Sequence, residues 1–162
     1  MKEYEKVYAE LNKLNIPFEI IEHPAAMTTE EADKYVEGIE GVLTKSLFLT
    51  NSKKTAYYLL IMDDKNRLDM GKFSEITGEK RLKLASPESL FQKMELHPGT
   101  VSIFGIINNS EKDINIYFEA GILKENRMSF HPNDNTKTLF LLTKDILKFI
   151  NSVGFEYKVA DL

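Results

Sequence analysis

The apolar and polar positions along the chain alternate between helical and strand-like segments. Val7, Leu11 and Leu14 share one stripe at helical spacing, which predicts an amphipathic helix over residues 3–14 that ends before Pro17. Short apolar runs rich in branched and aromatic residues predict strands. These runs cover residues 18–21, 42–50, 56–62, 68–70, 82–85, 100–107, 114–119, 138–142 and 155–159.

Helical patterns and capping signals predict four more helices. Thr28 and Glu31 have capping-box spacing, and Ser86 followed by Pro87 is typical of a helix start. The predicted helices cover residues 28–35, 71–76, 86–94 and 143–150, the last with Thr143 as its cap and Gly154 as its end. Strands predominate and no repeat or linker interrupts them, so we expect an α+β fold with one domain over residues 1–162, built around one curved sheet. Residues 42–50 and 56–62 should pair as a hairpin.

Composition narrows the functional classes. The 162 residues include no cysteine, which excludes disulfides, a thiol nucleophile and a cysteine-based zinc site. No apolar run approaches the roughly 18 residues of a membrane span, and the charged N-terminus is unlike a signal peptide, so we expect a cytoplasmic protein. The net charge is −4, yet basic residues crowd the middle of the chain. A local basic face for nucleic acid is one interpretation, and ordinary solvated surface charge is the simpler one.

Lys45 lies inside the apolar run of residues 42–50. A cation in such a strand is costly unless it is paired or faces a polar cavity. Its position therefore predicts a negatively charged ligand, such as a phosphate or a carboxyl-derived group.

Three loops each place a histidine before a proline: His23, His97 and His131. The proline holds each histidine backbone extended, which excludes a helical pair of metal ligands. Convergence of all three on zinc is conceivable, but no metal-motif spacing supports it and we expect no metal.

Gly99 and Thr100 could bring backbone N–H groups close to a ligand as an oxyanion hole, although a plain tight turn is the simpler interpretation. Ser46 and Ser102 have no identifiable base partner, and no nucleophile elbow or phosphate loop is present, so no protein nucleophile is indicated. Near His131, asparagines 133 and 135 either form a polar rim for a substrate or bond to their own backbone in a turn.

Taken in order, five motifs resemble the YbaK/ProX family of free-standing aminoacyl-tRNA editing domains, and within it the ProX-type (PrdX) branch. They are His23-Pro24 with Thr28-Thr-Glu-Glu-Ala32, Thr44-Lys-Ser-Leu-Phe-Leu49, Arg81-Leu-Lys-Leu-Ala-Ser-Pro-Glu-Ser-Leu90, Pro98-Gly-Thr-Val-Ser102 with Phe104-Gly105, and Phe130-His-Pro-Asn133 with Asn135-Thr136. The similarity covers almost the whole chain. It implies a mixed, mainly antiparallel sheet or barrel flanked by helices, as in the editing insertion of bacterial prolyl-tRNA synthetase.

The resemblance also implies an activity: hydrolysis of the ester between a wrong amino acid and the tRNA 3′ adenosine, without metal, cofactor or protein nucleophile. Lys45 would contact the terminal phosphate or ribose, and the Gly99 and Thr100 backbone would polarise the ester carbonyl. His131 would line the aminoacyl pocket or orient water. The implied substrate-binding residues are His23, Met27, Thr28, Ser46, Arg81, Ser102, Asn133 and Asn135.

The implied partners are the acceptor end of aminoacyl-tRNA and prolyl-tRNA synthetase. Ala-tRNA(Pro) is the expected substrate. Cys-tRNA(Pro) is an alternative, and so is a non-catalytic module that binds tRNA or synthetase or senses an amino acid. Ile103 stands where family members commonly have proline, which affects the expected pocket shape. The expected pocket walls are Ile20, Met27, Leu47 and Ile103.

Overall fold

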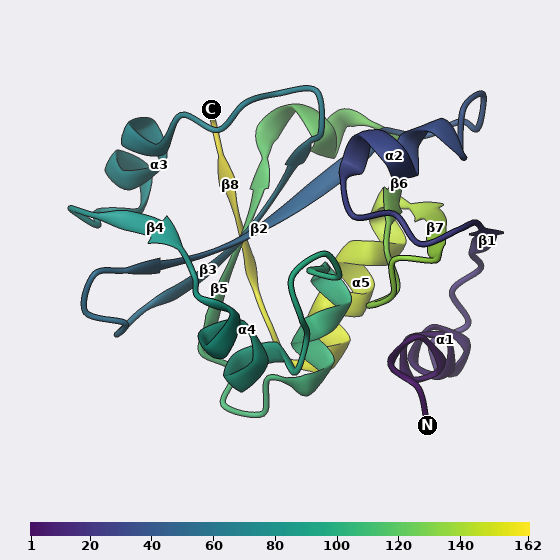
Figure 1. The fold of residues 1–162 in the computed structure, drawn as a ribbon, viewed down its shortest axis with the longest axis horizontal. Coiled ribbons are helices and arrows are strands. Elements are labelled where there is room, and N and C mark those ends of the chain that lie inside the picture. Colours follow the sequence, from purple (N-terminus) through teal and green to yellow (C-terminus); the bar gives the residue numbers. More distant parts are fainter.

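The computed structural model describes all residues from Met1 to Leu162. Five α-helices, two 3-10 helices (η) and eight strands follow one another along the chain (Figure 1). Their bounds are α1 (Glu3–Lys13), β1 (Glu19–Glu22), α2 (Thr29–Lys34), β2 (Thr44–Asn51), β3 (Tyr57–Asp63), α3 (Met70–Thr77), β4 (Leu82–Leu84), α4 (Pro87–Met94), η1 (Ile103–Asn108), β5 (Ile114–Glu119), η2 (Ala120–Lys124), β6 (Arg127–Phe130), β7 (Lys137–Leu142), α5 (Thr143–Val153) and β8 (Tyr157–Ala160).

The strands form two sheets. One has five strands in the order β4-β2-β3-β5-β8, and the other has three in the order β1-β7-β6. The predicted β2–β3 hairpin is confirmed, with Lys45 opposite Met62. β5 runs parallel to β3 and to β8, while the other pairings are antiparallel. The predicted α+β class with a mixed, mainly antiparallel arrangement is confirmed. The expectation of one curved sheet is wrong in detail, because the strands divide between two sheets and neither closes into a barrel.

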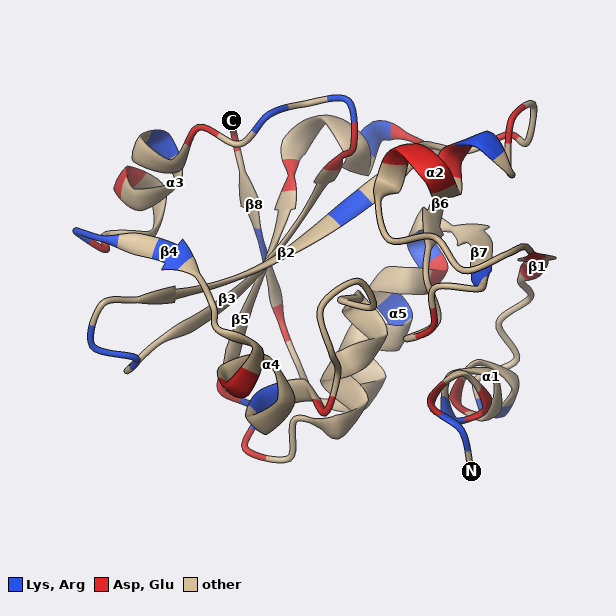
Figure 2. Cartoon of the chain, in the orientation of Figure 1, with Lys and Arg blue, Asp and Glu red and all other residues tan.

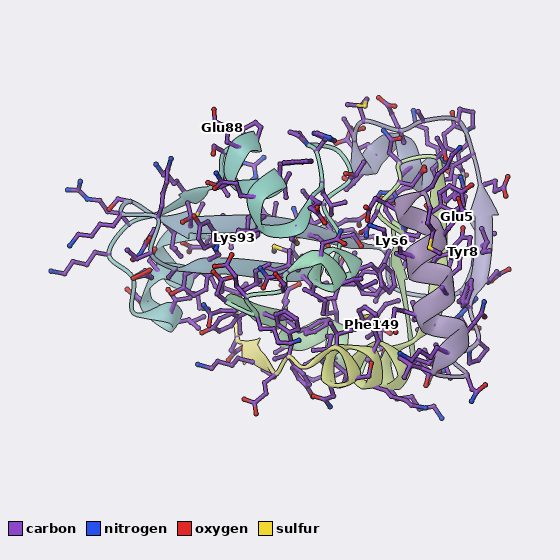
Figure 3. The ribbon with its side chains drawn as sticks, turned by 90° about the horizontal axis from the view of Figure 1, so that it is seen from below. Glu5, Lys6, Tyr8, Glu88, Lys93 and Phe149 are labelled. Carbon is purple, nitrogen blue, oxygen red and sulfur yellow. The ribbon has the colours of Figure 1, made fainter.

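The central strand β3 separates two apolar layers. Its side chains alternate, so Leu59 and Ile61 join the main core while Leu60 and Met62 join a smaller cluster beneath α3. The main core also takes in the buried faces of α1, α4 and α5, and Phe149 of α5 points into it (Figure 3). This packing fixes β2, the neighbour of β3, from both faces.

A short parallel contact joins the two sheets. The Val42 N–H donates to the Arg127 carbonyl, and the Ser129 N–H donates to the Val42 carbonyl, at 2.9 and 3.0 Å. Two residues further on, the Thr44 hydroxyl donates to the Ser129 carbonyl. The start of β2 is thereby held beside the end of β6, and Lys45 is brought to the segment that leads into His131.

The capping signals located the helices well. Thr28 and Ser86 accept hydrogen bonds from backbone N–H groups of α2 and α4, as predicted. The predicted cap Thr143 is wrong: it already lies in α5, and its hydroxyl donates to the Glu125 carbonyl at 2.6 Å. The predicted strand at residues 68–70 is also wrong, because Asp69 caps α3.

A strand is predicted over residues 100–107, but residues 103–107 belong to η1 and residues 100–102 form no strand. Ser102 accepts a hydrogen bond from the Phe104 N–H and turns the chain into the helix. Ile103, Phe104 and Ile106 are then all buried in the main core. A short apolar run fits a buried helix or a buried strand equally well, and here packing against α4 decides between them.

No helix of the protein combines the length and the apolar character that crossing a membrane requires.

Gly105 tests the packing of η1. A Cβ at this position would lie 2.7 Å from Met94 Sδ and 2.8 Å from a Leu96 methyl carbon, whereas a Cβ on Gly121 of η2 would meet nothing within 4 Å. Gly105→Ala should therefore lower the free energy of unfolding by about 1–3 kcal/mol. The matched Gly121→Ala should change it by less than about 0.5 kcal/mol. Urea unfolding of both variants measures the difference, and equal midpoints would contradict the tight packing.

Candidate active site

A small pocket lies where the start of β2 meets three loops. Its volume is about 190 Å³, below the roughly 300–1,000 Å³ of common small-molecule sites, so it suits a compact chemical group. Its lining residues are Ala26, Met27, Thr28, Thr29, Thr44, Lys45, Ser46, Leu47, Gly99, Val101, Phe130 and His131.

Met27 connects the three loops that carry the His-Pro pairs. Its side chain is 66% exposed and packs over Gly99, since a Cβ built on that glycine would lie 3.4 Å from the Met27 methyl carbon. On another side the Asn135 amide nitrogen lies 3.4 Å from the Met27 sulfur. The backbone adds to this, because the Ala26 N–H donates to the Asn135 carbonyl. The loops around residues 23–28, 97–102 and 131–136 therefore meet at one place.

Lys45 lines this pocket and is half-buried. The protein provides no ion-pair partner for its ammonium group; every salt bridge in the structure involves other residues. An unpaired, partly desolvated cation favours an anionic or strongly polar ligand. The inference from sequence thus has a matching geometry, although the role of Lys45 stays a prediction.

His131 borders the same pocket and is held as a neutral ring. Its Nδ1 lies 3.0 Å from the Lys137 carbonyl, which can only accept, so Nδ1 carries the proton. Burial lowers the pKa of His131 below 6.5, with a smaller contribution from the nearby His23. The remaining nitrogen, Nε2, has a lone pair and no partner within the protein, so it can accept a proton or a hydrogen bond.

His23 supports His131 and does not line the pocket. Its ring lies 6.5 Å from the His131 ring and stacks on Tyr35 at 5.2 Å. Its Nδ1 lies 2.9 Å from the Pro24 carbonyl, and its Nε2 lies 2.9 Å from the Thr138 hydroxyl. Both ring nitrogens are occupied, which favours a positioning role.

The Gly99 loop offers fewer free donors than the sequence suggested. The Thr100 N–H and hydroxyl both donate to the His97 carbonyl, at 3.1 and 2.8 Å. The Gly99 N–H has no acceptor within the protein. Gly99 also adopts a φ of +92°, which favours glycine and lets the backbone border the pocket without a side chain.

Several other predicted residues lie outside the pocket. Arg81 is exposed beside β4, and Ser102 is buried as the cap of η1. Asn133 is only 6% exposed, and neither its amide nitrogen nor its oxygen has a partner. Of the four expected walls, Met27 and Leu47 line the pocket, whereas Ile20 is exposed on β1 and Ile103 is buried in the core.

The sequence analysis missed five lining residues: Ala26, Thr29, Thr44, Val101 and Phe130. Each is the immediate neighbour of a predicted site residue in the chain. Adjacency in the sequence could therefore have identified them, because loops that converge on a small pocket line it with consecutive residues.

A larger depression of about 720 Å³ lies between α2, residues 36–43 and the start of β6. None of the predicted site residues lines it, and its walls include the acidic residues Glu30, Asp33, Glu37, Glu40, Asp63 and Glu125. Burial and the neighbouring Asp64 raise the pKa of Asp33 to about 8. An acidic wall repels a polyanion, so the smaller pocket is the better candidate. No group of three or more histidine, cysteine or acidic side chains is placed to hold a metal ion.

The pocket combines the free lysine Lys45, the lone pair on His131 Nε2 and the unpaired Gly99 N–H. Within this α+β fold, such a site is suited to binding and polarising a small ester. Comparison with known families identifies the class directly. The family model described as "Aminoacyl-tRNA editing domain" matches residues 23–149. The chain therefore belongs to the aminoacyl-tRNA editing domain family. This confirms the expected family and its enzymatic class, aminoacyl-tRNA deacylase.

Individual relatives are similar along most of their length. The prolyl-tRNA editing protein ProX of Acetoanaerobium sticklandii is 30% identical over 157 residues, which cover 96% of this chain and 95% of ProX. The prolyl-tRNA synthetase associated domain-containing protein 1 of Danio rerio is 28% identical, over 86% of this chain and 77% of its own. A crystal structure described as a candidate trans-editing enzyme for prolyl-tRNA synthetase has a TM-score of 0.76 at 24% identity, covering 100% of this chain and 97% of the other.

The buried state of His131 should be visible in the pH dependence of stability. Its pKa is lowered in the folded protein, so the unfolded chain binds the proton more readily. The stability from neutral His131 is present above pH 6.5 and is lost as the pH falls through the folded pKa. Relative to His131→Gln, the wild type should lose up to about 1.4 kcal/mol per pH unit as the pH falls below about 6.5.

Denaturant unfolding of the two proteins side by side measures this difference. Other titrating groups, such as Asp33, are present in both proteins and cancel. Parallel pH profiles would contradict the proposed environment of His131.

Proposed function

We propose that this protein hydrolyses wrongly charged tRNA in trans, with Ala-tRNA(Pro) as its main substrate. The observation that carries the proposal is Lys45, an unpaired cation on the wall of a small pocket that His131 also borders. The prolyl-tRNA editing protein ProX, similar over nearly the whole chain, supports the choice of tRNA(Pro). Because charged tRNA is made and used in the cytosol, we expect the protein there.

In the proposed mechanism, Lys45 binds the 3′-terminal phosphate or ribose and holds the ester at the pocket. The free Gly99 N–H donates to the ester carbonyl, which polarises it and stabilises the developing oxyanion. Nε2 of neutral His131 accepts a proton from the attacking water. The new C–O bond to water forms, the bond to the ribose oxygen breaks, and that oxygen takes up a proton. The ribose 2′-hydroxyl is a further candidate for orienting the water.

The limited discrimination of a synthetase by size explains why a separate editing protein is useful. A synthetase pocket for proline excludes the smaller alanine weakly, because each missing methylene is worth about 1–3 kcal/mol. A second pocket that admits alanine and rejects proline supplies the missing discrimination. Here Met27, Leu47, Val101 and Phe130 provide apolar walls around about 190 Å³. Prolyl-tRNA synthetase is the natural partner, since it makes both the correct and the wrong ester.

A panel of charged tRNAs tests this proposal. Purified protein is incubated with tRNA(Pro) carrying alanine, cysteine, serine or proline, and loss of each ester is followed. We expect alanine to be released fastest and proline to be retained. Fastest release of cysteine would assign the second candidate substrate instead. Binding of tRNA without loss of any ester would point to a non-catalytic module.

Replacement of Lys45 tests its role within the site. Lys45→Ala removes the anchor for the 3′ end and should lower the deacylation rate by about 10²–10³. Lys144→Ala is the matched control, since Lys144 is an exposed lysine on α5 outside the pocket, and it should keep the wild-type rate. Full activity of Lys45→Ala at unchanged thermal stability would refute the assigned role.

A further inference from the structure

Five exposed cations gather at one edge of the five-stranded sheet, and we call them the basic edge. They are Lys53, Lys54, Lys80, Arg81 and Lys83. The first two lie in the β2–β3 turn and the others lie on or beside β4, which pairs with β2 so that Lys83 stands opposite Thr50. Figure 2 shows these blue segments together at the end of the molecule far from α1.

None of these cations is neutralised by the protein itself. All salt bridges involve other residues, and no acidic residue occurs in residues 50–56 or 80–85. Glu79 is the nearest acidic residue in the sequence, and it forms no salt bridge with any of these cations. In a chain of net charge −4, this is a concentrated positive surface. Such a surface is complementary to a phosphate backbone.

Strand β2 connects the basic edge to the pocket. Lys83 of β4 stands opposite Thr50 near the end of β2, and Thr44, Lys45, Ser46 and Leu47 at the start of the same strand line the pocket. Four residues of strand separate Thr50 from Ser46, a distance of about 13 Å. With phosphates about 3.4 Å apart along a stacked strand, this corresponds to about four nucleotides.

An exposed aromatic pair follows the basic edge along the chain. Phe91 on α4 is 49% exposed, and its ring stacks on His97 with the centroids 5.3 Å apart. His97 precedes the pocket residue Gly99 by two positions, so the two Cα atoms lie within about 7 Å. Unpaired nucleotides stack on exposed aromatic rings of this kind.

We propose that the basic edge and the Phe91–His97 pair bind the acceptor arm of the tRNA outside the pocket. The cations contact phosphates of the arm, and the aromatic pair stacks on an unpaired nucleotide next to the one whose ester enters the pocket. This inference rests on the proposed function for its choice of RNA. In this arrangement Arg81 contacts the phosphate backbone of the tRNA at a distance from the ester that is hydrolysed.

The experiment measures binding of uncharged tRNA(Pro) as a function of salt concentration. The double variant Arg81→Glu/Lys83→Glu should bind at least about tenfold more weakly than wild type near 0.1 M salt. It should also reduce the slope of log K against log salt by about 1–2. The matched control is Lys144→Glu/Lys158→Glu, which makes the same change in net charge at α5 and at the opposite edge strand β8. It should stay within about threefold of wild type.

A third variant separates stacking from charge. Phe91→Ala should weaken tRNA binding by about tenfold and leave the salt slope unchanged, because stacking releases no counterions. Thermal unfolding of all variants checks that each is folded.

The outcomes distinguish this proposal from the proposed function, because binding of uncharged tRNA involves no hydrolysis. Equal tRNA affinities for the two double variants would overturn the basic edge even if the protein deacylates Ala-tRNA(Pro). A wild type that does not bind tRNA at low salt would also overturn it. Loss of synthetase binding with unchanged tRNA binding would assign the surface to an acidic protein partner instead. Conversely, charge-dependent tRNA binding without turnover of any ester would retain the surface and remove the proposed activity.

Discussion

The backbone hydrogen bonds between Val42 and β6 decide where the site lies. They join a segment near residue 42 to one near residue 128, so that Lys45 and His131 border one pocket although about half of the chain separates them. Backbone bonds of this kind fix register, and a slip by one residue would turn every side chain of the strand start to the other face. The Thr44–Ser129 bonds reinforce the same register. The junction, more than any single side chain, produces the arrangement of the pocket.

Around this junction the protein leaves polar groups without partners. Lys45 has no counter-ion, His131 Nε2 has no donor, and the buried Asn133 amide is unsatisfied. A buried unsatisfied polar group costs about 1–3 kcal/mol, and the core of 25 buried apolar residues offsets that cost. By contrast, Lys93 is a cation whose charge the protein neutralises itself, since it pairs with Glu111 and Asp113. Lys45 and His131 differ from it because their free bonding capacity borders a pocket, where a ligand can supply a partner.

Charge is distributed unevenly over this acidic protein. The wide depression beside α2 carries most of its charge as carboxylates, while the basic edge and Lys45 lie at β2 and β4. Net charge governs long-range attraction, but contact with phosphates depends on the local surface. Separation of the two signs would orient an approaching polyanion towards β4 and away from the carboxylates of the wide depression.

The sequence by itself determined the local elements: the helix starts at Thr28 and Ser86, the β2–β3 hairpin, and the anomaly of Lys45 within a strand. These depend on side chains bonding their own backbone and on short-range periodicity. The helical form of residues 103–108 and the parallel pairing of β5 were decided only by the tertiary structure, because a short apolar run fits several partners equally well. Tertiary structure alone also brought Met27, Gly99 and His131 together. That convergence depends on contacts between segments far apart in the chain, such as Thr44 with Ser129, which are 85 residues apart, and local periodicity carries no signal for them.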